Sequence, residues 1–238
     1  MGARVGSGSR AFGRLGGDRA VLALAIAAAL AVLGATFTLV LRWPAAVGAP
    51  DAPSLPISIG GLVFNVPPAA IRVPLQRHAG AQSRLDLVFL WPALVPPDPA
   101  AKPIGLEEVA PIDRMFVTIT VPDDALGPAE RIKSIYPRYF DFGRFAGPEG
   151  LLVIRFRDGT PYQGEDLFYD PAAPDRFAVR CTRPGTDSMP GICLFERRLA
   201  EAADVIVRFP RDWLAEWRPL SSAIEKLIAG LQARPASS

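Results

Sequence analysis

Apolar and polar residues alternate along short runs of this chain, which is the pattern of strands with one buried face. The 25 prolines and 21 glycines fall mostly between these runs, where they mark turns. The sequence therefore predicts about seven or eight strands joined by turns. The strand-like runs are residues 57–66, interrupted by two glycines, 85–91, 115–121, 151–157, 166–169, 176–182, 192–199 and 204–209.

A short helix is predicted in the middle of the chain, from Pro128 to Tyr136. Proline suits the first helical turn, and Glu130 lies near the positive end of the helix dipole. Two isoleucines fall on the same side as Tyr136, and Pro137 is expected to end the helix.

The C-terminal region predicts a longer helix, because its apolar residues recur at spacings of three and four positions. Pro219 interrupts this stripe, and Ser222 with Glu225 matches a capping box, so we expect a kink or two consecutive helices. The stripe fits a helix that covers one face of a sheet, and a partner-binding stripe is the alternative. Its members are Trp213, Trp217, Leu220, Ile224, Leu227 and Leu231.

The N-terminal part carries the longest apolar run. Residues 20–41 contain no charge, Asn, Gln or Pro. As a helix they would span roughly 33 Å, enough for a hydrocarbon core of about 30 Å. Arg19 and Arg42 bracket the run, and Trp43 takes the position of an interfacial aromatic residue. A signal peptide cleaved near residues 46–49 is the alternative, but the apolar region of such peptides is shorter, about 7 to 15 residues.

The arginines near this run predict its orientation. Four arginines precede it, and after Arg42 no basic residue occurs until Arg72. The N-terminus is therefore expected in the cytoplasm. The strong preference for arginine over lysine, with abundant Ala, Gly and Pro, suggests a bacterial chain of GC-rich origin. We therefore expect a single-pass protein of the inner membrane with its C-terminal domain in the periplasm.

These features divide the chain into five segments. Residues 1–19 are a basic cytoplasmic tail, 20–42 the transmembrane helix, 43–56 a linker rich in Pro and Ala, 57–234 the periplasmic globular domain and 235–238 a disordered tail. The lipid bilayer is thus a predicted partner of residues 20–42. Alanines at every fourth position also allow a weak homodimer through the span; they are Ala23, Ala27, Ala31 and Ala35.

The fold class predicted after the transmembrane helix is α+β, a mainly antiparallel β domain with the short middle helix and the C-terminal helix. A β-sandwich with appended helices is the alternative. Nucleic acid is not an expected partner. Without Asp18 and the five arginines of the tail and its border, the chain keeps 21 basic and 23 acidic groups, and its basic residues are scattered.

Only two cysteines occur, Cys181 and Cys193, on strand-like runs that flank a segment with two prolines and two glycines. This arrangement predicts a hairpin that places the cysteines opposite each other, as in a structural disulfide of an oxidising compartment. A redox pair is disfavoured because its cysteines are normally separated by two residues. A zinc site is disfavoured because the chain has one histidine only.

The sequence predicts no catalytic residue, cofactor site or metal site. Nucleophilic catalysis needs an activating base, and the sole histidine, His78, lies in a polar stretch between strands, where we interpret it as a surface residue. A carboxylate-dependent hydrolase remains as the alternative to a protein without enzymatic activity. Its acids would come from Glu107, Glu108, Asp123, Asp124, Glu165 and Asp166.

Aromatic and basic residues gather after the middle helix, a mixture that occurs at protein contact surfaces. A loop that packs back onto the sheet would show the same composition. The candidate contact residues are Tyr139, Phe140, Phe142, Arg144 and Phe145.

An exported, disulfide-bonded domain without catalytic groups predicts a binding or accessory module. Such a module would be an inhibitor, an immunity factor or a factor of an envelope complex, with a periplasmic protein as its partner. A periplasmic hydrolase with paired carboxylates and a structural subunit of an envelope complex are the alternatives.

Overall fold

The structure is a computed structural model and describes residues 25–34, 53–98, 112–185 and 191–232. The chain divides into two compact units, residues 1–45 and 46–238, and each is considered by itself. In the first unit, residues 25–34 form a helix with exposed apolar side chains.

No helix among the described residues is long and apolar enough to cross a bilayer, so the predicted transmembrane helix gains no support from them. The rest of that prediction, residues 20–24 and 35–42, lies outside the described residues, as do the predicted tails 1–19 and 235–238.

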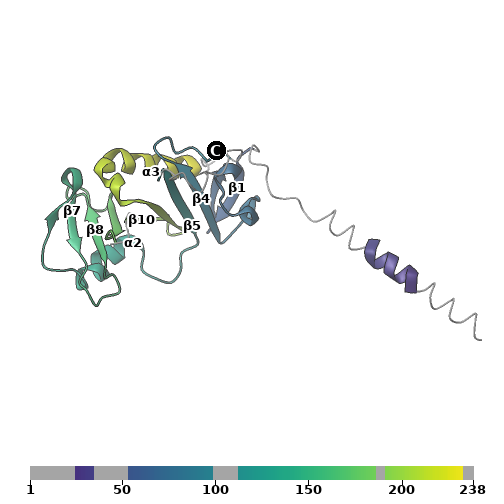
Figure 1. The fold of residues 1–238 in the computed structure, drawn as a ribbon, viewed down its shortest axis with the longest axis horizontal. Helices are drawn as coiled ribbons and strands as arrows, with labels where there is room; N and C mark the ends of the chain where they lie inside the picture. Colours follow the sequence, from purple (N-terminus) through teal and green to yellow (C-terminus); the bar gives the residue numbers. More distant parts are fainter. Residues whose placement is uncertain (1–24, 35–52, 99–111, 186–190, 233–238) are drawn as a thin grey trace, which may run out of the picture. The chain divides into compact units, whose positions relative to one another are not determined.

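An antiparallel sheet of eight strands forms the framework of the second unit (Figure 1). The antiparallel arrangement was predicted, but the predicted strand 57–66 lies in a second sheet. From β11 to β6 the strands are neighbours in reverse chain order, and β5 joins this meander by pairing with β11. In spatial order the strands are β4 (Arg84–Leu90), β5 (Arg114–Thr120), β11 (Ala203–Pro210), β10 (Ile192–Leu199), β9 (Ala178–Thr182), β8 (Glu165–Tyr169), β7 (Leu152–Arg155) and β6 (Phe145–Ala146).

A second sheet has three short strands in the order β2 (Leu62–Val66), β1 (Leu55–Ile59) and β3 (Gly80–Ala81). Gly60 and Gly61 form the turn between β1 and β2, both at positive φ. A side chain at Gly60 would overlap the carbonyl oxygen of Ala202, so this turn requires glycine for space as well as for conformation.

The main core lies on one face of the large sheet, where every second residue of the strands is buried. Helix α3 (Trp217–Leu231) and the small sheet contribute to this core, so both cover the same face of the large sheet. The arrangement therefore has the predicted mainly antiparallel sheets with a middle helix and a C-terminal helix. The residues of α3 that are buried are Trp217, Leu220, Ile224, Ile228 and Leu231.

Of the two predicted alternatives, a kink or two consecutive helices, the second is present, and α3 is not interrupted at Pro219. A 3-10 helix, η6 (Arg211–Glu216), precedes α3, and Pro219 lies in the first turn of α3. A proline in that turn removes no helical hydrogen bond. Ser222 is inside the helix, so the predicted capping box is wrong. Glu225 instead lies near two arginines, Arg176 at 3.3 Å and Arg197 at 3.5 Å.

The middle helix is present as a segment of changing helical type: α2 (Pro128–Glu130), a π-helical turn (Arg131–Ile135) and η4 (Tyr136–Arg138). The segment continues one turn past the predicted end, because Pro137 is tolerated near the start of the 3-10 turn. It packs on the face of the large sheet opposite to the main core, called here the outer face. There Tyr136 joins Phe156 and Leu167 in a second, smaller core.

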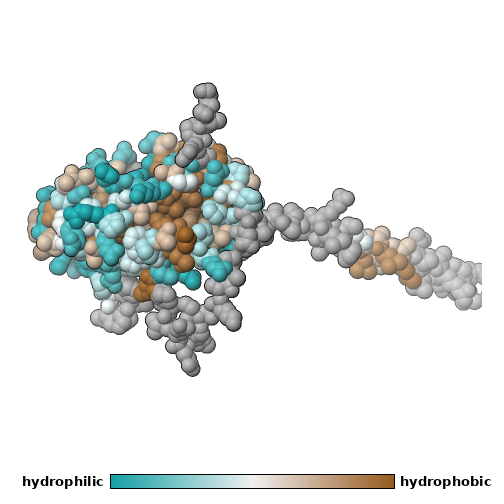
Figure 2. All heavy atoms as spheres, turned by 90° about the horizontal axis from the view of Figure 1, so that it is seen from above, coloured by the Kyte–Doolittle hydropathy of each residue, from teal (hydrophilic) through white to brown (hydrophobic). Residues whose placement is uncertain are grey.

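The remaining short helices are 3-10 turns: η1 (Pro68–Ala70), η2 (Pro74–Gln76) and η5 (Pro148–Gly150). Figure 2 views the molecule from the side on which α3 lies in Figure 1. Hydrophobic side chains gather there in a band across the second unit, with hydrophilic side chains on both sides of it.

The predicted disulfide between Cys181 and Cys193 is confirmed. The two residues are direct partners in the pairing of β9 with β10, with Cα atoms 4.0 Å apart, and both are fully buried. Closing a loop of this length contributes on the order of 3 kcal/mol to stability.

Asp86 of β4 is a buried carboxylate on the outer face of the sheet, and it holds η2 in place. It accepts hydrogen bonds from Arg84 at 2.8 Å, Thr118 at 3.0 Å and Gln76 Nε2 at 3.2 Å, while its own N–H donates to Gln76 Oε1. The hydrogen bond from Arg84 is the main reason that the pKa of Asp86 is lowered to about 2.

We predict that the stability contributed by Asp86 is lost in acid. Because its pKa is lower in the folded state than in the unfolded chain, its contribution is complete above about pH 4 and falls as the pH drops toward 2. Asp86→Asn should lower the free energy of unfolding by about 2 kcal/mol at pH 7. Urea titrations should show the difference from wild type shrinking between pH 4 and 2, and a pH-independent difference would contradict the assignment.

Candidate protein-contact surface

The adjacent acids Glu165 and Asp166 do not form a catalytic pair. They follow each other in β8, so their side chains leave opposite faces of the sheet. Glu165 forms an ion pair with Arg180 at 3.3 Å, and burial raises the pKa of its carboxyl. Asp166 is buried on the other face between Arg183 and Arg211. Each carboxylate is therefore committed to an arginine.

The other residues considered for chemistry are exposed or lie outside the described ranges. His78 lies on an exposed loop, with Nδ1 3.1 Å from the carbonyl oxygen of Ala79. Asp123 and Asp124 are exposed, and Glu107 and Glu108 are outside the described residues. Within the described ranges, three or more His, Cys, Asp and Glu side chains nowhere gather as a metal site would require.

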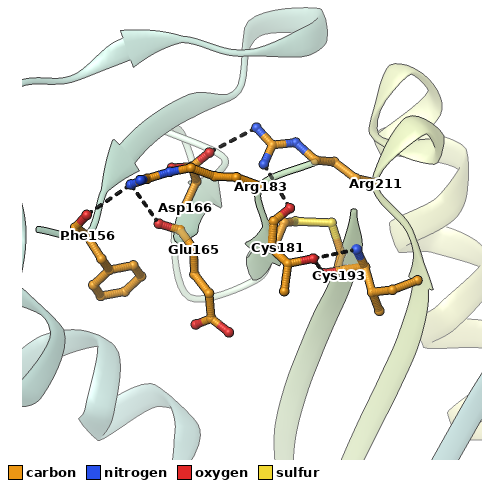
Figure 3. A network of polar contacts seen from close by, with 9 residues as sticks. Phe156, Glu165, Asp166, Cys181, Arg183, Cys193 and Arg211 are labelled. Atoms are coloured by element: carbon orange, nitrogen blue, oxygen red, sulfur yellow. Dashed lines mark hydrogen bonds and ion pairs between the residues drawn. A yellow bond between two sulfur atoms is a disulfide. The ribbon is translucent and has the colours of Figure 1, made fainter. Parts of the chain in front are cut away.

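Asp166 joins three parts of the chain near the disulfide (Figure 3). Asp166 Oδ1 is 2.9 Å from Arg183 Nε, and Asp166 Oδ2 is 3.0 Å from Arg211 Nη2. Arg183 also donates to the carbonyl oxygens of Phe156 and Glu165, and Arg211 donates to that of Thr182. These bonds fix the ends of β8 and β9 to the start of η6.

We predict that Asp166→Ala lowers the free energy of unfolding by about 3 kcal/mol, because two partly buried guanidinium groups lose their carboxylate. Asp158 is the matched control, since it approaches the same Arg183 at 3.8 Å but is 92% exposed. Asp158→Ala should cost less than about 1 kcal/mol in the same urea titration. Equal losses in the two variants would show that Asp166 has no special role.

Residues 139–146, called here the edge segment, form the outer border of the large sheet. Its first residues run beside the end of β7: the N–H of Arg157 donates to Tyr139 O at 2.9 Å, and that of Asp141 to Arg155 O at 2.8 Å. Its last residues are β6, which pairs with β7. A strand at this border has one unpaired side, as edge strands of open sheets do.

The structure divides the five candidate contact residues into two groups. Tyr139 and Phe140 pack inward against the second core, with the Phe140 ring 5.2 Å from Phe156. Phe142, Arg144 and Phe145 face solvent, and Phe142 is 95% exposed. Phe142 thus contributes almost nothing to the fold, whereas Tyr139 and Phe140 stabilise the segment that carries it.

Arginines without a carboxylate partner accompany these exposed rings. Arg138, Arg144, Arg155 and Arg157 form no ion pair in the part of the chain that the structure describes. Arg155 stacks on the Phe145 ring at 4.6 Å, and Arg157 donates to the carbonyl oxygen of Arg138. Arginine and aromatic side chains that are held in place in this way are typical anchors of protein interfaces.

A hollow of about 480 Å³ adjoins the edge segment between β6 and η6. Its lining includes Phe145 and Arg155 together with Phe168, Arg211 and Asp166. Such a recess beside an exposed aromatic ring could receive a side chain of a partner protein.

Sequence reasoning found the aromatic residues of the edge segment but missed Arg155 and Arg157 as members of the same surface. Arg155 and Arg157 come from β7 and its exit, so only the pairing of the edge segment with β7 brings them there. The alternation of Arg155 and Arg157 with Phe156 was the available signal, because it places both arginines on the side opposite to the buried ring.

Neither a family model nor a curated protein matches this chain. Among solved structures, the fold is similar to Smlt3025, an immunity protein of the Stenotrophomonas maltophilia type IV secretion system. The similarity covers 76% of this chain and 94% of that chain, with 14% sequence identity and a TM-score of 0.52. At this identity, what the comparison shows is a common fold.

Proposed function

We propose that this protein is a binding module of the immunity type, which neutralises a protein toxin by binding it through the edge segment. The exposure of Phe142 is the observation that carries the proposal, because a ring that is 95% exposed has no role in the core. The exposed rings and arginines beside it have the composition of an interface core. The fold shared with an immunity protein supports the same class of function.

The charge of the edge segment favours an acidic partner. Arg144 and its neighbours Arg138, Arg155 and Arg157 have no carboxylate partner among the described residues, and a partner that presents Asp and Glu would neutralise them. Complementary charge would also speed the encounter of the two proteins. This matters for an immunity factor, which must reach a toxin before the toxin reaches its target.

The proposed location is the periplasmic side of the inner membrane, with residues 20–42 as the anchor. The absence of charge from residues 20–41 and the arginines before them support this placement. The buried disulfide also fits an oxidising compartment.

We predict that reporter enzymes active only outside the cytoplasm are active when fused after Trp43 and at Ser238. The reason is that the arginines of the tail should remain in the cytoplasm while the following domain is exported. Immunoblots should show the full-length chain. A shortened active product would replace the anchor by a cleaved leader, and inactive fusions would overturn the proposed location.

We predict that Phe142→Ser weakens partner binding about 10- to 30-fold, since buried aromatic anchors dominate interfaces. The partner is first identified with a photoreactive phenylalanine analogue at position 142 of the full chain. The crosslinked protein, exported to the periplasm of a test bacterium, should be toxic alone and harmless when this chain is co-produced.

Val63→Ser is the matched control, because Val63 is an exposed apolar residue of β2, outside the edge segment. Val63→Ser should protect as well as wild type, and Phe142→Ser should not, although both variants keep the wild-type melting temperature. Equal protection by both variants, or a crosslinked protein that is not toxic, would overturn the proposed function.

A further inference from the structure

The outer face of the large sheet carries apolar side chains where a solvated face would be polar. In the pairing of β4, β5, β11 and β10, one row across the sheet is Val88, Phe116, Arg208 and Leu194. The core takes the alternate residues of these strands, so this row points away from it. Phe116 and Leu194 remain partly exposed. Outward positions of a solvated antiparallel sheet are normally polar.

Neighbouring outward positions extend this apolar area. Ile206 lies beside Glu196 in the pairing of β11 with β10 and is partly exposed, and Ile192 at the start of β10 is 39% exposed. The second core covers another part of the same face, over β8, the end of β7 and the start of β9. The loop between β5 and α2 borders Ile206, since residues of both line one hollow. Within the described residues, the second core contributes no side chain over Phe116 and Leu194.

Three arginines surround this area. The Arg72 guanidinium lies 5.3 Å from the centre of the Phe116 ring, and Arg208 is the direct cross-strand partner of Phe116. Arg114 precedes Phe116 by two residues in β5, so it leaves the same face. None of the three forms an ion pair with a carboxylate within the described ranges. Arg72, Arg114, Arg208, Phe116, Leu194 and Ile206 are called here the arginine face.

The carboxylates nearest to this face are already engaged. Asp86 is bound by Arg84, Thr118 and Gln76. Farther along the strands, Asp204 is bound by Arg198. Arg208 donates a hydrogen bond to Thr118 at 3.5 Å, but among the described residues none of the three arginines forms an ion pair with a carboxylate. The apolar centre is therefore bordered by positive charge.

We propose that the arginine face is a second interaction surface, which binds an acidic segment of a protein that carries apolar side chains among its carboxylates. Arginines that border aromatic and aliphatic side chains are characteristic of interface cores, from which acidic residues and lysine are depleted. The bordering positive charge selects an acidic partner. A protein segment fits better than a membrane surface, because the apolar residues lie on a flat sheet and do not protrude as inserted side chains must.

This surface is independent of the proposed function. It uses β5, β10 and β11, whereas the edge segment lies beside β7 at the far border of the same sheet. The two surfaces share no residue, so variants of one should leave binding at the other unchanged. A chain with both surfaces would bind two partners, or two separate parts of one partner.

The test uses the full chain in a nonionic detergent and a fluorescent peptide rich in Glu and Leu. Fluorescence anisotropy should show saturable binding that weakens as NaCl is raised, since exposed charges are screened. Arg72→Ala/Arg208→Ala should weaken binding about tenfold or more, the effect of losing about 1.4 kcal/mol of binding free energy. Arg176→Ala, which removes an exposed arginine outside both surfaces, is the matched control and should bind as wild type does.

Several outcomes would overturn the proposal. These are unaltered peptide binding by the double variant, equal binding of a Lys-rich peptide of the same pattern, and arginine-dependent binding to phosphatidylglycerol in the micelles without binding to the peptide. Should the double variant fail to fold, Arg72→Ala decides alone, because the Arg72 side chain is exposed and outside the core. Loss of toxin protection in Phe142→Ser with retained peptide binding would separate the two surfaces.

Discussion

The pairing of β5 with β11 is the constraint on which the rest of the domain depends. It joins a strand from the middle of the chain to the last strand, through partners that run from Phe116 with Arg208 to Thr120 with Asp204. Without it, β4 and β5 would be a separate hairpin, and the meander from β6 to β11 would lack a neighbour on one side. Bringing such distant segments together has an entropic cost that local contacts do not repay. The buried residues Val117 and Ile119 of β5 and Val205 and Val207 of β11 offset that cost.

Local pattern was sufficient for much of this fold. Alternation located the long strands, and the spacing of apolar residues located α3. The hairpin around Cys181 and Cys193 could be predicted because its strands are neighbours in sequence and turn residues lie between them. Non-local pairing has no such signal, so the β5–β11 contact could not be derived. Two-residue strands such as Phe145–Ala146 are too short to show alternation. Pro219 does not kink α3, because it lies in the first helical turn, where proline is tolerated.

The candidate surfaces were predictable to different degrees. The edge segment could be recognised from its composition. Which of its rings face solvent depends on the pairing with β7, because that pairing places Phe140 against Phe156 and leaves Phe142 exposed. The arginine face had no local signal. Arg72, Phe116 and Arg208 are far apart in sequence and meet only through the pairing of β5 with its neighbours and a loop contact. A surface built from three distant segments becomes visible only when the sheet is known.

The disulfide and the Asp166 network together make the outer half of the sheet stiff. Cys181 is bonded to Cys193 of β10 and is paired with Asp166 of β8, while Arg211 ties Asp166 to the element that leads into α3. The disulfide and these ion pairs therefore hold β8, β9 and β10 together, and β7 with the edge segment is paired onto this group of strands. A binding surface paired onto strands that are already fixed loses less conformational entropy when a partner binds, so less of the contact energy is spent on ordering it.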